Sequence, residues 1–360
     1  MSNILILGNL SDGQTGLYLL EACKSVSSNV AAIDIRAIAN EINYPESQTV
    51  ILDEVKALKM MPELIIVMKG LEMDYDTLLG IKNRCPKATI VNWFFDKFLG
   101  PKPIWEQTQY FDTLRFYDYY FCSLKGVSDK LQSMGFKNAI YLDEACSPSF
   151  HACSYYNHFQ EQKYGEDISF VGSLGFTNMH TKRIEILQHI IKEGLHIKIW
   201  GDMLGDAKSI PLEIRHAHTG FKAINDAHSM IANASLINLG IDQDDKLELG
   251  YSARLHRVLC AEGLYLTNYV PKLETVFKIN LKGEPITDKQ DLVVYYDNSD
   301  MIEKIDFLLS NESLRKQIAK NGKETILKNH TFEMRIKEML KVIENGKKEE
   351  KENLRIVGGE

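Results

Sequence analysis

Residues 167–183, DISFVGSLGFTNMHTKR, place a short apolar run directly before a glycine-serine turn and a helical pattern. Residues 168–171 have the length and composition of a buried strand, and Gly172 and Ser173 end it. After a polar loop, Thr181 opens a segment whose apolar residues recur at helical spacing. The stretch therefore predicts a strand, a turn and a helix in that order.

This turn has the features of an anion site. Free backbone N–H groups and the positive end of the helix dipole meet where such a strand ends. Lys182 and Arg183, predicted at the head of the helix, would oppose that dipole unless an anion lay between them. A diphosphate would suit the place, although a glycine-serine pair after a strand is also a common tight turn without any ligand.

The same alternation of strand and helix fills both halves of the chain. The predicted strands are 3–8, 29–35, 63–70, 88–95, 117–123 and 139–145 in the first half, and 167–173, 196–202, 235–241, 264–268 and 292–298 in the second. Most are apolar throughout, as parallel sheets covered on both faces require. Amphipathic helices are predicted at 299–311, 312–329 and 331–344. The fold class is therefore α/β, with two doubly wound Rossmann-like domains and C-terminal helices.

A change in composition marks the predicted domain boundary. Residues 147–167 are polar and aromatic without a clear period, which suits a surface linker. We predict an N-terminal domain at 1–150, a linker at 151–166, a C-terminal domain at 167–330, a helix at 331–346 and a flexible tail at 347–360. Because open α/β sheets bind ligands at the carboxyl ends of their strands, the two domains are expected to face a central cleft.

Composition excludes several classes of function. The 360 residues contain 42 Lys and Arg against 49 Asp and Glu, a net charge of -7, and no basic stripe that would bind duplex nucleic acid. The six cysteines are scattered, without metal-binding spacing, which favours reduced thiols and a cytoplasmic location. The sequence contains no run of about 18 consecutive apolar residues, so no membrane span is predicted. Its first residues lack the pattern of a signal peptide.

The segment 250–277, GYSARLHRVLCAEGLYLTNYVPKLETVF, adds two arginines to the second domain. Arg254 and Arg257 lie one turn apart at the start of a predicted helix, and guanidinium groups match phosphate oxygens. Two arginines on a helix are often only a solvated face. Their combination with Gly263, the strand at 264–268 and Glu274 makes the pattern more specific.

Several motifs together resemble a known family. DISFVGS (167–173), IKIWGD (197–202), HTG (218–220), LINLGI (236–241), the segment 251–277 and KNHTFEMRIKEML (328–340) are similar to the C-terminal domain of the CgeB-like (spore-maturation protein) glycosyltransferases, which have the GT-B fold. PELIIVMKG (62–70), IVNWFFD (90–96) and YLDEACSP (141–148) resemble their N-terminal half. The resemblance covers most of residues 1–340. It implies metal-independent transfer of a sugar from a nucleotide sugar, a UDP- or GDP-sugar among the candidates, to a hydroxyl of a glycan or protein.

The resemblance also implies a donor site in the C-terminal domain. Its residues by position are Gly172, Ser173, Lys182, Arg183, Trp200, Gly201, Asp202, Gly220, Ser252, Arg254, Arg257 and Glu274. The glycine turn would approach the diphosphate, the basic residues would neutralise it, and 200–202 with Gly220 would lie at the base. Glu274 would orient the sugar or the ribose. Related enzymes often read R-x-F-E where this chain reads RLHR, so Arg257 stands where a ribose-binding glutamate is expected.

The acceptor side is predicted in the N-terminal domain. Asn9, Asp12 and Gly13 follow the first strand, and Asp96 follows the strand at 88–95. Asp12 or Asp96 would deprotonate the acceptor if the reaction inverts the anomeric carbon. Otherwise Asp12 is a turn former and Asp96 a cap or loop residue. The aromatic residues of 95–116 would stack on an acceptor sugar or fill a core.

Other kinds of site are less favoured by the sequence. The acidic run DQDD at 242–245 has spacing that can bind a cation, but a solvated loop is the favoured interpretation. The histidines are too dispersed in the sequence for a zinc site. No cofactor beyond the nucleotide sugar is expected. Asp34 ends the second strand as in NAD-binding units, but the first loop lacks their glycine pattern. Two alternatives remain: a non-catalytic nucleotide-sugar sensor or subunit, and a sugar-nucleotide epimerase of the same architecture.

Overall fold

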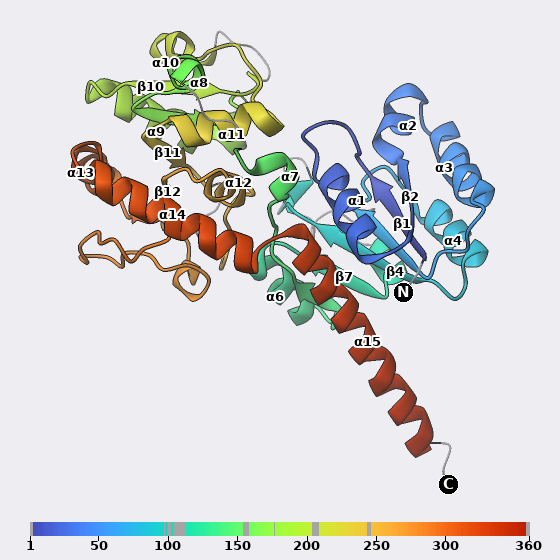
Figure 1. Ribbon diagram of the computed structural model, residues 1–360. Helices are drawn as coiled ribbons and strands as arrows, with labels where there is room; N and C mark the ends of the chain where they lie inside the picture. The colour runs from blue at the N-terminus through green and yellow to red at the C-terminus, as the bar shows by residue number, and fades with distance from the viewer. Residues whose placement is uncertain are drawn as a thin grey trace. The chain divides into compact units, whose positions relative to one another are not determined.

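The computed structural model describes residues 3–96, 98–99, 102–103, 112–153, 158–175, 177–203, 209–242 and 246–357 (Figure 1). The chain divides into two compact units. The first comprises Met1–Glu144 and Phe332–Glu360, and the second comprises Ala145–Thr331. Each unit is an α/β structure with its own parallel sheet.

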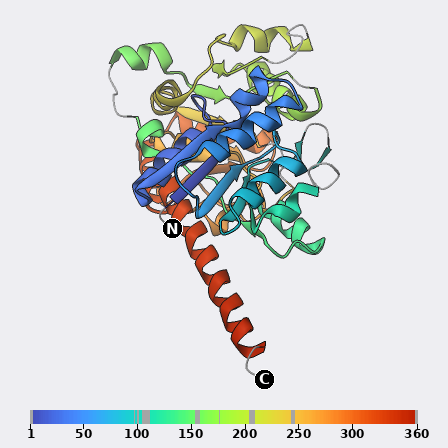
Figure 2. The ribbon, with the colours of Figure 1, turned by 90° about the vertical axis from the view of Figure 1, so that its right-hand side faces the viewer.

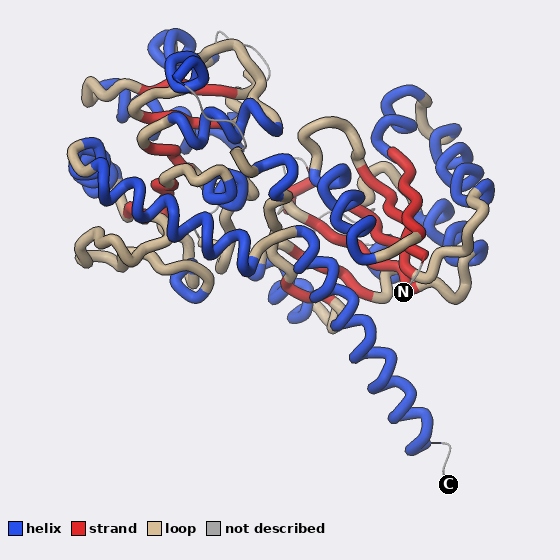
Figure 3. The backbone as a smooth tube through the Cα atoms, in the orientation of Figure 1, coloured by secondary structure: helices blue, strands red, loops and turns tan. Residues whose placement is uncertain are grey.

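The first unit contains a six-stranded sheet in the order β2-β1-β3-β4-β7-β8, with parallel pairing throughout. Its strands are β1 (Asn3–Gly8), β2 (Asn29–Asp34), β3 (Leu64–Met68), β4 (Thr89–Phe94), β7 (Tyr119–Cys122) and β8 (Ala139–Tyr141). A short antiparallel pair, β5 (Phe98–Leu99) and β6 (Lys102–Pro103), follows β4. The central strands β1 and β3 are buried along most of their length because helices cover both faces of the sheet (Figure 3).

The helices of the first unit come from both ends of the chain. They are α1 (Thr15–Val26), α2 (Ile35–Glu41), α3 (Glu46–Ala57), α4 (Tyr75–Arg84), the 3-10 turn η2 (Leu114–Phe116), α6 (Lys125–Ser133) and α15 (Phe332–Val357). Phe332 at the start of α15 packs on Tyr18 of α1 and on Trp93 of β4, with ring centroids 6.0 Å apart in each pair. The rest of α15 extends beyond the sheet of this unit (Figure 2).

The second unit contains a five-stranded parallel sheet in the order β10-β9-β11-β12-β13. Its strands are β9 (Ile168–Val171), β10 (Ile197–Trp200), β11 (Ile237–Gly240), β12 (Tyr265–Asn268) and β13 (Val293–Tyr295). Its helices are α7 (Pro148–His151), α8 (His158–Tyr164), α9 (Thr177–Lys192), α10 (Leu212–Ala217), α11 (Asn225–Ala234), α12 (Arg254–Cys260), η4 (Leu273–Thr275), α13 (Asn298–Leu309) and α14 (Glu312–Asn329). Apolar residues of α9 and α13 pack on this sheet to form its core.

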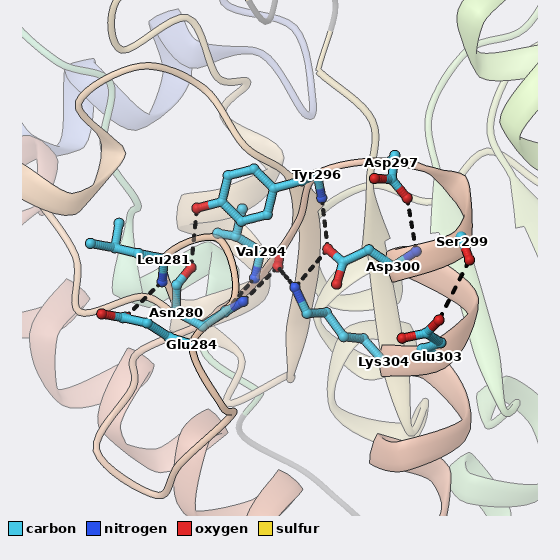
Figure 4. A network of polar contacts seen from close by, with 10 residues as sticks. All are labelled: Asn280, Leu281, Glu284, Val294, Tyr296, Asp297, Ser299, Asp300, Glu303 and Lys304. Atoms are coloured by element: carbon cyan, nitrogen blue, oxygen red, sulfur yellow. Dashed lines mark hydrogen bonds and ion pairs between the residues drawn. The ribbon is translucent and has the colours of Figure 1, made fainter.

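Polar side chains close the edge of this sheet beside β13 (Figure 4). The Asn280 side chain donates to the carbonyl of Val294 and accepts from its N–H, both at 2.8 Å. Lys304 of α13 donates to the same carbonyl at 2.7 Å and pairs with Asp300 at 2.7 Å. These bonds occupy backbone groups that an edge strand would otherwise leave open to another chain.

The structure differs from the sequence prediction at several element boundaries. Helix α9 begins at Thr177, four residues before the predicted start, so Lys182 and Arg183 lie in its second turn. Helices α7 and α8 occur where a linker was predicted, and α15 continues to Val357 through most of the predicted tail. The residues before Thr181 show no apolar period in the sequence, which predicts a loop, but their backbone is helical from Thr177 onward.

Candidate functional site

The strand order of the second unit reverses at β9, and open α/β sheets generally bind ligands at such a reversal. The chain passes from β9 to β10 on one side and continues with β11 on the other side of β9. In open α/β sheets, such a reversal separates the crossover connections at the carboxyl ends of the two strands concerned, which here are β9 and β11. Gly172 and Asp242 follow those two strands.

Two arginines from different helices meet over one aromatic ring in this region. Arg254 of α12 donates from Nε to the carbonyl of Val171 at 2.5 Å, and its guanidinium carbon lies 4.7 Å from the ring centre of Phe170. Arg183 of α9 donates to the carbonyl of Ser173 at 3.0 Å, and its guanidinium carbon lies 5.9 Å from the same ring centre. The structure thus brings together four of the predicted donor residues: Gly172, Ser173, Arg183 and Arg254.

These arginines carry unused hydrogen-bonding capacity. Arg183 is only 6% exposed, and burial together with the charge of Arg254 lowers its pKa to about 10. Among the described residues, Nε of Arg183 and Nη1 of Arg254 have no hydrogen-bond partner. Buried donors without partners are costly, and two neighbouring cations repel each other. An anion bound between them would relieve both conditions.

Asp242 is a buried structural carboxylate, so the predicted solvated loop is wrong at this residue. Its side chain is 1% exposed and accepts from the N–H of Ser252 at 2.8 Å and from the hydroxyl of Thr267 at 3.1 Å. Burial raises its pKa, while Arg254 and these hydrogen bonds act in the opposite direction. Asp242 therefore holds the segment before α12 against β12. Residues 243–245 lie outside the described residues.

Ser252 contributes through its backbone in this arrangement. Its N–H is the donor to Asp242, and because Ser252 lies two residues before α12, this bond helps to fix where Arg254 begins that helix. Lys182, the other basic residue predicted at the head of α9, is half-buried. It lies on a different side of α9 from the buried Arg183.

The segments at 200–202 and 218–220 are joined by backbone contacts. Gly172 donates its N–H to the carbonyl of Trp200 at 2.8 Å, and Leu174 donates to that of Asp202 at 2.9 Å. His218 bridges the two segments, because its Nδ1 accepts from Gly220 at 3.0 Å and its Nε2 lies 2.9 Å from the carbonyl of Gly201. Since Nδ1 is an acceptor, Nε2 carries the hydrogen and donates to Gly201. The N–H of Gly172 is thus already used within the protein.

Trp200 and Asp202 differ in their surroundings. Trp200 is 5% exposed and packs between Tyr164 and Phe221, with ring centroids 6.0 and 6.2 Å away. Asp202 forms a partly exposed ion pair with Lys222 at 3.1 Å. Trp200 therefore serves the packing of this edge, whereas the exposed Gly220 leaves open space beside the chain.

The remaining two predicted donor residues have other contacts. Glu274 of η4 accepts from the hydroxyl of Tyr269 at 3.1 Å, and Tyr269 in turn stacks on Tyr296. Arg257 lies near the buried His228 of α11. Burial, followed by the positive charges of Arg257 and Arg254, lowers the pKa of His228 to about 3. The described contacts of Glu274 do not include the arginine pair, so the structure gives it no direct link to a diphosphate there.

Sequence reasoning missed His180 in this region. It lies on α9 three residues before Arg183, is 5% exposed, and its Nδ1 has no partner among the described residues. The spacing of three residues on a helix was the available signal, because it puts both side chains on one face. The scatter of the histidines along the sequence argues only against a zinc site and does not indicate where His180 lies.

In the first unit, the predicted acceptor residues lie in loops at the carboxyl edge of the sheet. Asn9 accepts from the N–H and hydroxyl of Ser11 at 3.1 and 2.5 Å, which shapes the turn that contains Asp12 and Gly13. Asp12 is exposed, and Gly13 has φ +79°. Asn9 and Gly13 therefore organise the turn, and Asp12 is presented to solvent.

Asp96 pairs with a lysine from the neighbouring strand end. Nζ of Lys69 lies 2.5 Å from its carboxylate, and both side chains are partly exposed. Lys69 has φ +59°, an unusual backbone conformation for a residue other than glycine. Most of the predicted acceptor loop, from 97 to 111, lies outside the described residues, apart from the backbone of β5 and β6.

Asp34 has a structural role that explains its position. It caps α2 by accepting from Ala37 at 2.8 Å and accepts from the N–H of Leu10 at 3.0 Å. Its carboxylate is therefore engaged in holding the first loop against α2, in agreement with its interpretation as a strand-end residue.

Comparisons with known proteins fit this architecture. Residues 182–341 match a family model described as "Glycosyl transferase-like". Solved structures of glycosyltransferases with two Rossmann-like domains match nearly the whole chain. The chain has the GT-B fold. No curated protein sequence matches it at a significant level.

Three structures illustrate the GT-B likeness. Sucrose-phosphate synthase from Thermosynechococcus elongatus is 11% identical, with a TM-score of 0.66 over 96% of this chain and 99% of that one. HepE from Anabaena, in complex with UDP-glucose, is 9% identical, with a TM-score of 0.64 over 96% and 100%. An alpha-glucosyltransferase in complex with UDP-glucose and DNA is 10% identical, with a TM-score of 0.64 over 95% and 99%. The family match and the GT-B fold support a glycosyltransferase, while the CgeB-like subfamily remains a prediction.

The GT-B chain shows no candidate for a membrane-spanning helix. Among the described residues, no helix combines the length and apolar character that crossing a bilayer requires.

Proposed function

We propose that this protein transfers a sugar from a nucleoside-diphosphate sugar to a hydroxyl acceptor, and that Arg183 and Arg254 bind the diphosphate. The observation that carries the proposal is the pair of guanidinium groups over Phe170, with unpartnered donors on both arginines. Their place at the strand reversal of the second sheet is where α/β folds bind ligands. Two GT-B neighbours whose structures contain UDP-glucose support a nucleotide sugar as the donor.

The chemical contribution of the arginines is to stabilise the leaving group. When the bond between the sugar and the diphosphate breaks, negative charge grows on the phosphate oxygen. Guanidinium groups already fixed by Val171, Ser173 and Phe170 interact more strongly with that developing charge than with the intact donor. We propose that this positive charge takes the place of a catalytic metal ion.

Some of the other predicted site residues have a proposed role, and others have none beyond the prediction. The exposed backbone at 218–220, held to Gly201 by His218, is the proposed edge for the nucleotide base. Asp96, positioned by Lys69, is the proposed acceptor base in the first unit, with Asp12 as the alternative. Lys182, Arg257 and Glu274 remain predicted donor residues that the described contacts neither join to the arginine pair nor assign to another ligand.

Titration with UDP and with UDP-glucose, followed by calorimetry, tests the diphosphate site. Arg254→Ala and Arg183→Ala should each weaken UDP binding by about 10- to 100-fold, because each removes a charged hydrogen-bonding partner. Arg254→Lys should recover only part of the affinity, since an ammonium group lacks the planar fork. Arg215→Ala is the matched control, because Arg215 is exposed on α10 and should leave UDP binding unchanged.

The same titrations name the nucleotide and separate binding from catalysis. GDP, dTDP and CMP, tested beside UDP, identify the preferred base. Slow hydrolysis of the bound sugar nucleotide without an acceptor supports an enzyme, whereas binding without turnover in the presence of varied acceptors would indicate a sensor. If none of the nucleotides binds, or if both arginine variants bind as the wild type does, the proposed site is wrong.

A further inference from the structure

His180 lies beside the arginine pair without being among the residues that the sequence assigns to the site. It is on the same face of α9 as Arg183, one helical turn earlier. Its ring is 5% exposed, and its Nδ1 has no hydrogen-bond partner in the ranges that the structure describes. A buried ring nitrogen without a partner is costly unless a ligand supplies one.

The groups that act on His180 come from two helices. Arg183 faces it from α9 and Arg254 from α12, and burial together with these two positive charges lowers its pKa to about 4. The acidic group that acts on the arginines, Asp242, is engaged with Ser252 and Thr267. At neutral pH the ligand-free site therefore contains a neutral imidazole beside the two guanidinium groups, with Asp242 as the acidic group that acts on them.

We propose that His180 is a third ligand of the diphosphate and that it takes up one proton from solvent when the diphosphate binds. The inference rests on the proposed function, because it needs the anion between Arg183 and Arg254. The proton goes to the unpartnered Nδ1, which then becomes a donor to a phosphate oxygen. The site thereby gains a positive charge only when the ligand that requires it is present.

The size of the electrostatic effect is sufficient. A negative charge about 4 Å away, at an effective dielectric constant of about 20, raises the pKa of a neighbouring base by about 3. A diphosphate carries more than one negative charge and also offsets the two arginines. Binding therefore brings His180 from a range where it is neutral into one where it is protonated near neutral pH.

The sign of the resulting pH dependence follows from linkage. The complex holds a proton that the free protein lacks, so the affinity for the diphosphate increases as the pH falls below the pKa of His180 in the complex. The increase continues until the pH reaches about 4, the pKa of His180 in the free protein. Below that value both states are protonated and the gain ends. The proton balance of the phosphate ligand itself changes in the same range, so a variant must separate the two contributions.

The experiment is calorimetric titration of the full chain with inorganic pyrophosphate and with UDP, at about pH 6.5, in two buffers of different ionisation enthalpy. The difference in apparent enthalpy between the buffers gives the number of protons taken up. His180→Asn is the test variant, because its amide nitrogen can replace Nδ1 as a donor but does not titrate. His189→Asn, on the same helix and partly exposed, is the matched control.

Wild type and His189→Asn should take up about one proton more per bound ligand than His180→Asn, whose affinity should also vary less with pH. Equal proton uptake in wild type and His180→Asn overturns the inference about His180 but leaves the diphosphate site intact. Failure of wild type to bind either ligand overturns the proposed function instead.

A measurement on the wild type covers the case in which His180→Asn does not fold. Nitrogen-15 NMR of the histidine rings reports protonation directly, and the ring assigned to His180 should change from neutral to charged on addition of pyrophosphate. A ring that stays neutral at saturation contradicts the inference without the use of any variant.

Discussion

Gly172 and Arg254, which are far apart in the sequence, are packed so closely that an added methyl group would not fit. A Cβ atom on Gly172 would lie 2.6 Å from Nη2 of Arg254 and 2.9 Å from Cζ of Phe170. The glycine is therefore needed to admit the guanidinium to the ring face and to the carbonyl of Val171. This contact explains why the strand ends in glycine without assigning its N–H to a phosphate.

Gly172→Ala should weaken diphosphate binding while the protein remains folded. The side chain of Arg254 is flexible and can move away, but it then loses its bond to Val171 and its position over Phe170. We expect about a tenfold loss of UDP affinity by calorimetry. In an Arg254→Ala background the same substitution should have almost no further effect, and a full second loss would show that the two residues act independently.

Gly201→Ala should destabilise the second unit more than an equivalent change at another glycine. Gly201 has φ +131°, and a Cβ there would lie 2.6 Å from the carbonyl oxygen of Gly172, which is backbone and cannot simply rotate away. Gly194 is the matched control, because it has φ +81° but open space around the added atom.

We expect Gly194→Ala to cost about 1 kcal/mol of unfolding free energy and Gly201→Ala about 3 kcal/mol or more, measured by urea denaturation. The difference combines the steric contact at Gly201 with the greater backbone strain of alanine at φ +131° than at φ +81°. Equal losses would mean that the backbone around Gly172 yields, and that the 200–202 segment is less rigidly held than its contacts indicate.

The fold was predictable because its signal is local. Strand β3 is apolar along its whole length and β1 is apolar after Asn3, and each is followed by a polar turn and an amphipathic helix. That pattern alone favours parallel sheets covered on both faces. The strand order is not fixed in this way, because sequential strands are only often neighbours, and β11 pairs with β9 and not with β10.

The candidate site was only partly predictable, because its contacts join distant segments. The sequence indicated Arg183 and Arg254 as phosphate ligands, but not that both lie over Phe170. Asp242 begins an acidic run that reads as solvated, and its burial depends on Ser252 and Thr267 in other elements. Trp200 packs on Tyr164, which the sequence assigned to a linker. No local pattern carries that information.

The stability of the second unit should fall in mild acid because of its buried histidines. His228 is 5% exposed, and burial followed by the charges of Arg257 and Arg254 lowers its pKa to about 3. An unfolded chain has a histidine pKa of about 6.5, so between these values the unfolded state binds a proton that the folded state does not. The full stability is present above about pH 6.5 and declines as the pH falls toward 3, by at most about 1.4 kcal/mol per pH unit for this residue.

Urea denaturation at several pH values between about 5 and about 7.5 measures this slope. His228→Gln should flatten it by close to one proton, even though the variant is less stable at neutral pH because it disturbs a buried position. His189→Gln, a change at a partly exposed histidine, should leave the slope unchanged. If His228→Gln retains the wild-type slope, the prediction is wrong, because His228 then does not remain neutral in the folded protein. That result would also mean that Arg254 and Arg257 produce a weaker positive potential at His228 than their positions indicate.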